Sequence, residues 1–287
     1  MNGNQLKWFY LLLLALIWGS SFILIELGLD GLNPFQLGSL RIIFAAIFLL
    51  AISFRSLPKI SRHQWKYVAL AALFGNFVPA YFFAIAETEI SSSVTAILNS
   101  LTPVNALILG VSFFGLAVKR TQVIGVTIGL AGTLLLILSG AIDNPDQNYW
   151  FAGFVLVATI CYATNVNLVK KYLSDVSPMA ITAGNFAVML APALIILAFS
   201  GPIDFDNAKV QHSALFVMVL GIFGTGIANV IFYRLIQMSS PVFATQVTYL
   251  IPVVACGWGI YYGEILTAWQ LVGAAIILVG VYLSGKK

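Results

Sequence analysis

The stretch from Trp8 to Gly28 reads WFYLLLLALIWGSSFILIELG and carries a single charged side chain, Glu26. A membrane-spanning helix needs about 20 consecutive apolar residues, so this stretch is long enough to cross a bilayer. The composition agrees, because 60% of the 287 residues are hydrophobic and only 8% are charged. A soluble domain has about 25% charged residues, and a disordered chain is much less hydrophobic. The sequence therefore predicts an all-α integral membrane protein.

Nine more apolar runs follow the first, and short polar turns separate them. The ten predicted helices cover residues 8–28, 34–54, 66–86, 91–114, 121–140, 150–170, 178–200, 212–236, 240–262 and 267–284. The connections between them are too short to hold a soluble domain.

The charged residues predict the orientation of these helices. With the N-terminus inside and the helices alternating in direction, 12 of the 14 Lys and Arg residues fall on the inner side, and 9 of the 10 Asp and Glu residues on the outer side. Basic residues mark cytoplasmic loops. A missed or extra helix would scramble this asymmetry, so it supports ten spans with both termini inside.

The two halves of the chain share spaced motifs, which predicts an internal repeat. Trp18 precedes Pro34 by 16 residues, and Tyr162 precedes Pro178 by the same interval. Further matches pair Pro103 with Pro252, and Gln122, Gly125 and Gly132 with Gln270, Gly273 and Gly280. Residues 1–142 and 143–287 then form two five-helix repeats. Because five is odd, the second repeat enters the membrane in the opposite sense, as in many secondary transporters.

Several short motifs occur in order along nearly the whole chain. They are Leu-Ile-Trp18-Gly-Ser-Ser, Pro34 followed by Leu-Gly-Ser-Leu-Arg41, Leu-Thr-Pro103-Val, Leu-Ile-Pro252-Val and Tyr-Gly-Glu264. In these motifs the sequence resembles the ten-helix EamA-like branch of the drug/metabolite transporter superfamily. The resemblance implies a five-plus-five inverted repeat and the export or exchange of small metabolites, often amino acids. One departure is Gly115-Leu116, where the first repeat would have a Gly-Glu pair.

Polar and aromatic side chains inside the apolar runs are the candidates for a substrate site, because polar groups in a membrane usually face the bundle interior. The predicted substrate-binding residues are Trp18, Ser21, Asn76, Tyr81, Thr95, Asn99, Tyr162, Asn165, Asn229, Gln246 and Tyr249. Amides would fix the polar atoms of a neutral or zwitterionic solute, and aromatic walls would contact its apolar part. The alternative interpretation of each such residue is a hydrogen bond that cross-links two helices.

A second set of residues is predicted to act in gating or structure. These are Glu26, Arg41, Pro103, Pro252 and Glu264. Arg41 is the only base well inside a span, and either a structural ion pair with Glu26 or the binding of an anionic substrate group would explain it. Pro103 and Pro252 each remove a backbone hydrogen bond, so they could serve as bending points or as static kinks.

The small-residue pattern Gly125, Gly129 and Gly132, echoed by Gly273 and Gly280, predicts close packing of two helices. Their spacing fits packing of the fifth helix on the tenth and fits packing between two protomers equally well, so a monomer and a homodimer both stay open.

The leading functional prediction is a multi-pass transporter of the bacterial inner membrane, working by alternating access at a midplane cavity between the repeats. Its partners would be a small-molecule substrate and membrane lipid, with no nucleic acid, no cofactor and no metal. A lipid or lipid-linked sugar flippase is the alternative within transport. An enzyme is disfavoured because acid–base or metal chemistry would need clustered carboxylates or histidines inside the membrane. An assembly protein would explain neither the repeat nor the polar residues.

Overall fold

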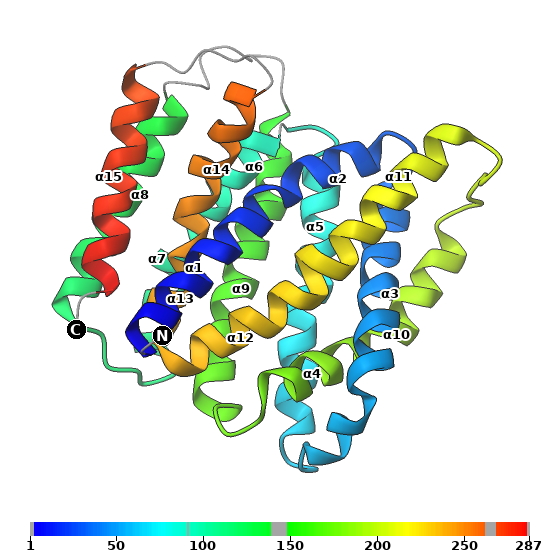
Figure 1. Ribbon diagram of the computed structural model, residues 1–287, viewed down its shortest axis with the longest axis horizontal. Coiled ribbons are helices and arrows are strands. Elements are labelled where there is room, and N and C mark those ends of the chain that lie inside the picture. Colours follow the sequence, from blue (N-terminus) through cyan, green and yellow to red (C-terminus); the bar gives the residue numbers. More distant parts are fainter. Residues whose placement is uncertain (1–2, 91, 139–147, 262–267, 286–287) are drawn as a thin grey trace.

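The computed structural model describes residues 3–90, 92–138, 148–261 and 268–285, and within these ranges the regular secondary structure is entirely helical. The α-helices are α1 (Gly3–Gly19), α2 (Ser21–Leu29), α3 (Pro34–Ser53), α4 (Trp65–Ala72), α5 (Val78–Ala86), α6 (Ser92–Asn99), α7 (Thr102–Ser112), α8 (Arg120–Leu138), α9 (Ala152–Tyr172), α10 (Pro178–Phe199), α11 (Ala208–Val219), α12 (Ala228–Met238), α13 (Pro241–Thr245), α14 (Val247–Tyr261) and α15 (Ala268–Gly285). Short 3₁₀ segments are η1 (Phe54–Lys59) and η4 (Tyr149–Phe151), and π-helical segments are η2 (Leu73–Phe77) and η5 (Leu220–Ile227). Figure 1 shows the helices as one bundle in which α1–α2 and α11–α12 run obliquely.

Each apolar run predicted from the sequence contains helix in the described residues. The first begins at Gly3, five residues earlier than expected, and is interrupted at Ser20. Six helices, some of them made of joined segments, are long and apolar enough to cross a membrane. The protein is therefore an all-helical membrane protein, and the full set of ten crossings stays a prediction.

Three helices begin with the same local device, a capping side chain followed by proline. Asn33 precedes Pro34, Ser177 precedes Pro178 and Ser240 precedes Pro241. In each case the capping side chain accepts a hydrogen bond from a free backbone N–H of the first turn, where proline itself lacks one. These pairs explain why the predicted starts at residues 34, 178 and 240 lie within one residue of the observed ones.

Two of the long helices contain a π-helical segment in the middle. In the first, η2 joins α4 to α5, and in the second, η5 joins α11 to α12. Adding 149 to the bounds of η2 gives residues 222–226, which lie inside η5. The same offset separates Pro103 from Pro252, so both π segments occupy matched places in the two halves.

Pro103 and Pro252 both lie close to an interruption of helix, and their role as bending points or static kinks stays a prediction. The chain leaves helix at Ser100 and Leu101, and Pro103 lies in the first turn of the following helix α7. In the second half the interruption is at Gln246, six residues before Pro252, which lies within α14. The two prolines therefore differ in their relation to the nearest helix break.

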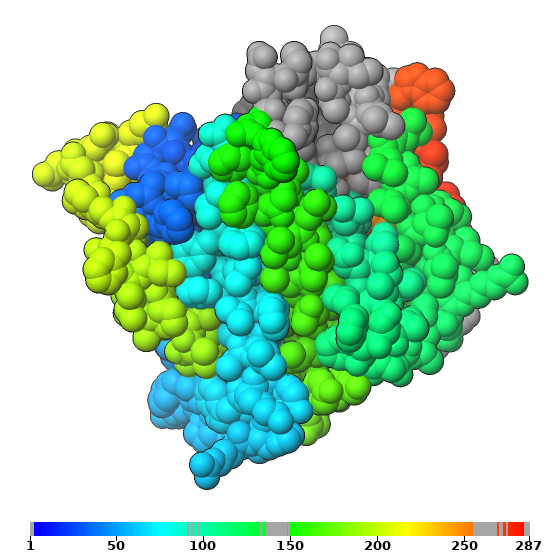
Figure 2. Space-filling model, turned by 180° about the vertical axis from the view of Figure 1, so that it is seen from behind, coloured from blue at the N-terminus to red at the C-terminus, as the bar shows by residue number. Residues whose placement is uncertain are grey.

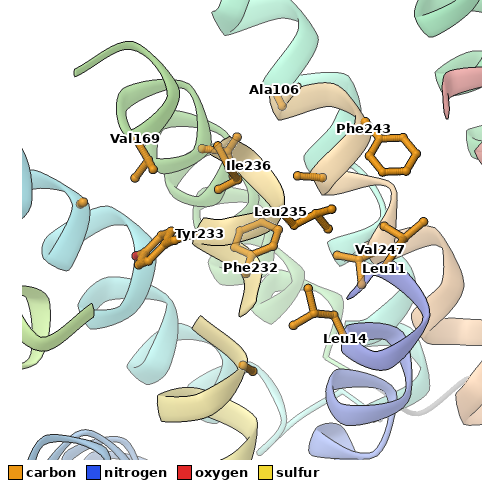
Figure 3. Close-up of a cluster of buried hydrophobic side chains, with 14 of the residues drawn as sticks. Leu11, Leu14, Ala106, Val169, Phe232, Tyr233, Leu235, Ile236, Phe243 and Val247 are labelled. Carbon is orange, nitrogen blue, oxygen red and sulfur yellow. The ribbon is translucent and has the colours of Figure 1, made fainter. Parts of the chain in front are cut away.

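A hydrophobic cluster holds several helices of the bundle together. Figure 3 shows side chains of α1, α12, α13 and α14 meeting there, among them Leu11, Leu14, Phe232 and Val247. Leu11, Leu14 and Val247 are fully buried. Each buried leucine or valine contributes about 1.5–3 kcal/mol in water, but in lipid the gain comes from close packing instead.

Helices α8 and α15 pack along each other (Figure 1). A Cβ atom added at Gly280 would lie 2.5 Å from the backbone nitrogen of Gly129 and 2.7 Å from the carbonyl oxygen of Gly125. One added at Gly132 would lie 2.9 Å from the carbonyl oxygen of Gly273. The glycine pattern therefore brings two helices of the same chain into backbone contact, which accounts for it without a second protomer.

Candidate substrate-binding site

A cavity lies inside the bundle, with about 860 Å³ of empty space when its open side is included. Eight of the predicted site and gating residues line it: Trp18, Ser21, Arg41, Asn76, Asn99, Tyr162, Asn165 and Asn229. They come from α1, α2, α3, η2, α6, α9 and α12, so helices from both halves of the chain build the wall.

Four other predicted site residues do not line this cavity. Tyr81 is buried and its hydroxyl lies 3.0 Å from that of Ser39. Tyr249 donates its hydroxyl proton to the carbonyl of Val126 at 3.0 Å, which turns its ring towards α8. Thr95 and Gln246 are also buried, and the side-chain nitrogen of Gln246 donates to a carbonyl of its own helix. Tyr81 and Tyr249 thus connect helices and Gln246 satisfies a local backbone group, whereas the hydroxyl of Thr95 is buried without a hydrogen-bond partner.

Several lining residues are not among the predicted site residues. They are two phenylalanines, Phe83 and Phe232, two glycines, Gly75 and Gly224, and four threonines, Thr102, Thr225, Thr245 and Thr248. The phenylalanines and the glycines are each 149 residues apart. The offset already visible at Pro103 and Pro252 could have identified them.

Two aromatic pairs form parts of the wall. The rings of Trp18 and Phe232 meet edge to face at 4.9 Å between centroids. Those of Tyr162 and Phe83 are 5.8 Å apart and nearly parallel. Trp18 also donates from Nε1 to the carbonyl of Gly224 at 2.8 Å. Each pair joins one helix of the first half to one of the second.

The two lining glycines permit close approaches of the same kind. A Cβ atom at Gly75 would overlap the side-chain amide of Asn165, and one at Gly224 would lie 2.7 Å from Ser21 Oγ. Ser21 and Asn165 are 144 residues apart, the offset that relates Trp18 to Tyr162. The absence of a side chain at each glycine therefore lets a polar group of the other half reach the cavity wall.

Beside the cavity, a buried polar network surrounds the hydroxyl of Tyr233. Asn76 donates to this hydroxyl at 3.3 Å, and Asn229 donates to Asn76 Oδ1 at 2.8 Å. With its amide oriented to satisfy both polar atoms, Asn185 accepts from the Tyr233 hydroxyl at 2.7 Å. Tyr233 is fully buried, so all these groups depend on one another for hydrogen bonds.

Tyr233→Phe is expected to lower the free energy of unfolding by roughly 1–3 kcal/mol, because the amides of Asn76 and Asn185 lose their partner while staying buried. Thermal unfolding in detergent measures this loss. Tyr282→Phe is the matched control, since Tyr282 is 60% exposed. Equal stability of the two variants would contradict a role for the network.

The predicted ion pair between Arg41 and Glu26 is not formed, although the structure describes both residues. Arg41 donates from Nε to Thr225 Oγ1 at 2.7 Å, whereas Glu26 accepts from Ser92 Oγ at 2.9 Å. The side chain of Arg41 reaches the cavity, and it donates its hydrogen bond to the hydroxyl of Thr225 in η5. Glu264, the other predicted gating carboxylate, lies outside the described residues.

An all-helical bundle with several apolar spans and a polar cavity between its halves defines a polytopic membrane protein of the transporter kind. The profile of the EamA-like transporter family matches residues 6–138 and again residues 150–285. The chain belongs to this family, which is part of the drug/metabolite transporter superfamily. Together with the six apolar spans, the family places the chain among multi-pass inner-membrane proteins.

Curated relatives match over nearly their full length. An "Uncharacterized transporter" of Archaeoglobus fulgidus is 28% identical over 98% of this chain and 99% of its own. The "Uncharacterized inner membrane transporter YedA" of Escherichia coli is 28% identical, covering 95% and 89%. A "Probable amino-acid metabolite efflux pump" of Salmonella typhimurium is 25% identical, covering 96% and 93%. A solved crystal structure with 17% identity matches 98% of this chain and 95% of its own at a TM-score of 0.75, which shows the same fold.

Proposed function

We propose that the protein is a secondary transporter that exports or exchanges a small amino-acid-like metabolite through the cavity between its halves. The observation that carries this is the composition of the wall: neutral amides, hydroxyls and aromatic rings, with Arg41 as its one cationic side chain among the described residues. Amide groups can form hydrogen bonds with the ammonium and carbonyl groups of a zwitterion. Arg41 can bind its carboxylate, and the aromatic rings can contact its apolar part. The Salmonella relative's name is in line with this class of substrate.

We further propose that residues 1–142 and 143–287 are inverted repeats, with ten crossings and both termini inside. Support comes from contacts that occur twice, with the roles of the first and the second half interchanged. Trp18 contacts Phe232 as Tyr162 contacts Phe83, and Gly224 approaches Ser21 as Gly75 approaches Asn165. Such pairs are expected when a pseudo-two-fold axis relates the repeats across a central site. Rocking of one repeat against the other would then expose the cavity to each side in turn.

Reconstitution into proteoliposomes tests the proposal. Vesicles preloaded with an unlabelled amino-acid mixture are expected to take up a radiolabelled one by exchange, with saturation, whereas protein-free vesicles are not. Asn99→Ala is expected to slow this exchange, because Asn99 is a buried amide that lines the cavity. Flipping of a fluorescent lipid without any solute exchange would overturn the proposal in favour of a flippase.

A further inference from the structure

The carboxyl group of Glu87 is buried without a hydrogen-bonding partner, although the residue as a whole is partly exposed. Glu87 follows directly after α5, at the outer end of the span Trp65–Ala86. Both of its carboxylate oxygens are shielded from solvent and neither accepts or donates a hydrogen bond. Buried carboxylates are normally paired or hydrogen-bonded, since an isolated charge is costly away from water. An unpartnered one therefore needs an explanation, and the neighbouring Glu89, which is exposed, shows that chain position alone does not impose it.

Glu87 continues the face of α5 that lines the cavity. Ala80 and Phe83 on this face are both lining residues, and Glu87 follows Phe83 by four residues and Ala80 by seven. Residues at these spacings stack on one side of a helix. Helix α5 packs against α3 and α9, and Figure 2 shows it beside α9 from behind. The carboxyl group is thus placed between the outer surface and the cavity.

Three charged or titratable groups on neighbouring helices interact with Glu87, either directly or through Arg41. Glu26 in α2 and Arg41 in α3 act on Glu87 electrostatically, and Tyr162 in α9 acts on Arg41. Burial raises the pKa of Glu87 well above its usual value; the Glu26 carboxylate raises this pKa further, and Arg41 lowers it. Arg41 and Glu87, both described, form no ion pair. Glu87 is thus an unpartnered carboxyl whose burial favours the protonated form, while the nearby cation Arg41 forms its hydrogen bond with Thr225.

We propose that Glu87 binds the proton that couples transport to a pH gradient, and that Arg41 transmits the charge state of Glu87 to the cavity. This inference rests on the proposed transport function and adds its driving ion. In the structure Arg41 holds Thr225 of η5, which belongs to the other half. When the Oε–H bond of Glu87 breaks, the proton passes to water and the carboxylate left behind attracts Arg41. The contact between α3 and η5 then weakens, and rebinding of a proton restores it.

The first test measures stability and needs no substrate. A carboxyl whose pKa is raised in the folded state stabilises that state at low pH, and its contribution is lost as pH rises from the ordinary glutamate value through the raised one. The melting temperature of the wild type in detergent should therefore fall with rising pH more steeply than that of Glu87→Gln, which mimics the protonated form. Glu89→Gln is the matched control and should follow the wild type. Parallel curves for all three proteins would overturn the proposal.

The second test uses proteoliposomes and a radiolabelled amino-acid mixture, with the membrane potential clamped. For antiport of one proton, a gradient of about one pH unit, acid inside, permits up to about tenfold solute accumulation. The wild type and Glu89→Gln are expected to accumulate solute under this gradient, whereas Glu87→Gln is not. Saturable exchange by the wild type that ignores the gradient would overturn proton coupling while leaving the transport function intact. Absence of any exchange would instead overturn the transport function on which the proposal rests.

Discussion

Gly280→Val is expected to lower the stability of the folded protein by forcing α8 and α15 apart. The first atom of a side chain here would lie 2.5 Å from one backbone atom of α8 and 2.7 Å from another. Because both are backbone atoms, no rotamer change can relieve the overlap, and the two helices must separate. Overpacking of this kind costs about 1–3 kcal/mol, occasionally more. Thermal unfolding of the detergent-solubilised protein measures the loss.

Gly153→Val is the matched control for this change. Gly153 lies in the first turn of α9, and a Cβ atom added there would meet no atom within 4 Å. Its replacement is expected to alter stability by only about 0.5 kcal/mol. If both variants unfolded at the same temperature, the backbone contact between α8 and α15 would not be a main source of stability in this bundle.

The glycine pattern illustrates how far sequence predicts the fold. Spacing at Gly125, Gly129 and Gly132 predicts a helix face that a neighbour can approach closely, because this follows from the helical period alone. The identity of the neighbour does not follow, because a helix of the same chain and one of a second copy present the same surface. The contact of Gly280 with α8 decides this within the chain.

The cavity illustrates the corresponding limit for the site. The amides Asn76, Asn165 and Asn229 were predicted because polar groups inside a span are costly unless they face the interior. Gln246 and Tyr249 satisfied the same rule but do not line the cavity. The helix is interrupted at Gln246, so the faces deduced for one continuous helix do not carry through this point. An uninterrupted 3.6-residue period cannot predict such a break, nor the π segments of the other helices.

The ion pair expected between Arg41 and Glu26 failed for a different reason. Glu26 was predicted near the outer end of the first helix and Arg41 inside the second, and opposite charges on adjacent helices suggest a pair. In the structure each finds a hydroxyl instead, Thr225 for Arg41 and Ser92 for Glu26. Hydroxyl groups from distant parts of the chain cannot be placed from one sequence, although the charges themselves can.

Trp18→Ala is expected to reduce amino-acid exchange in proteoliposomes by at least about tenfold, equivalent to about 1.4 kcal/mol in the transport barrier. The indole ring forms part of the cavity wall, packs on Phe232 and donates to the carbonyl of Gly224. Its loss would widen the cavity and remove a contact between the two halves beside the π segment η5. Both effects weaken the contacts that a bound solute makes in the closed state.

The control and an intermediate variant separate these effects from general destabilisation. Trp150→Ala removes an indole that is 90% exposed, and it should exchange solute like the wild type. Trp18→Phe keeps an aromatic ring against Phe232 but loses the hydrogen bond to Gly224, so its rate should lie between those of the wild type and Trp18→Ala. Rates are compared per folded protein, since replacing the partly buried Trp18 by alanine also lowers stability. Wild-type exchange by folded Trp18→Ala would mean that solute does not pass along this wall, and the cavity would then have to be assigned to packing alone.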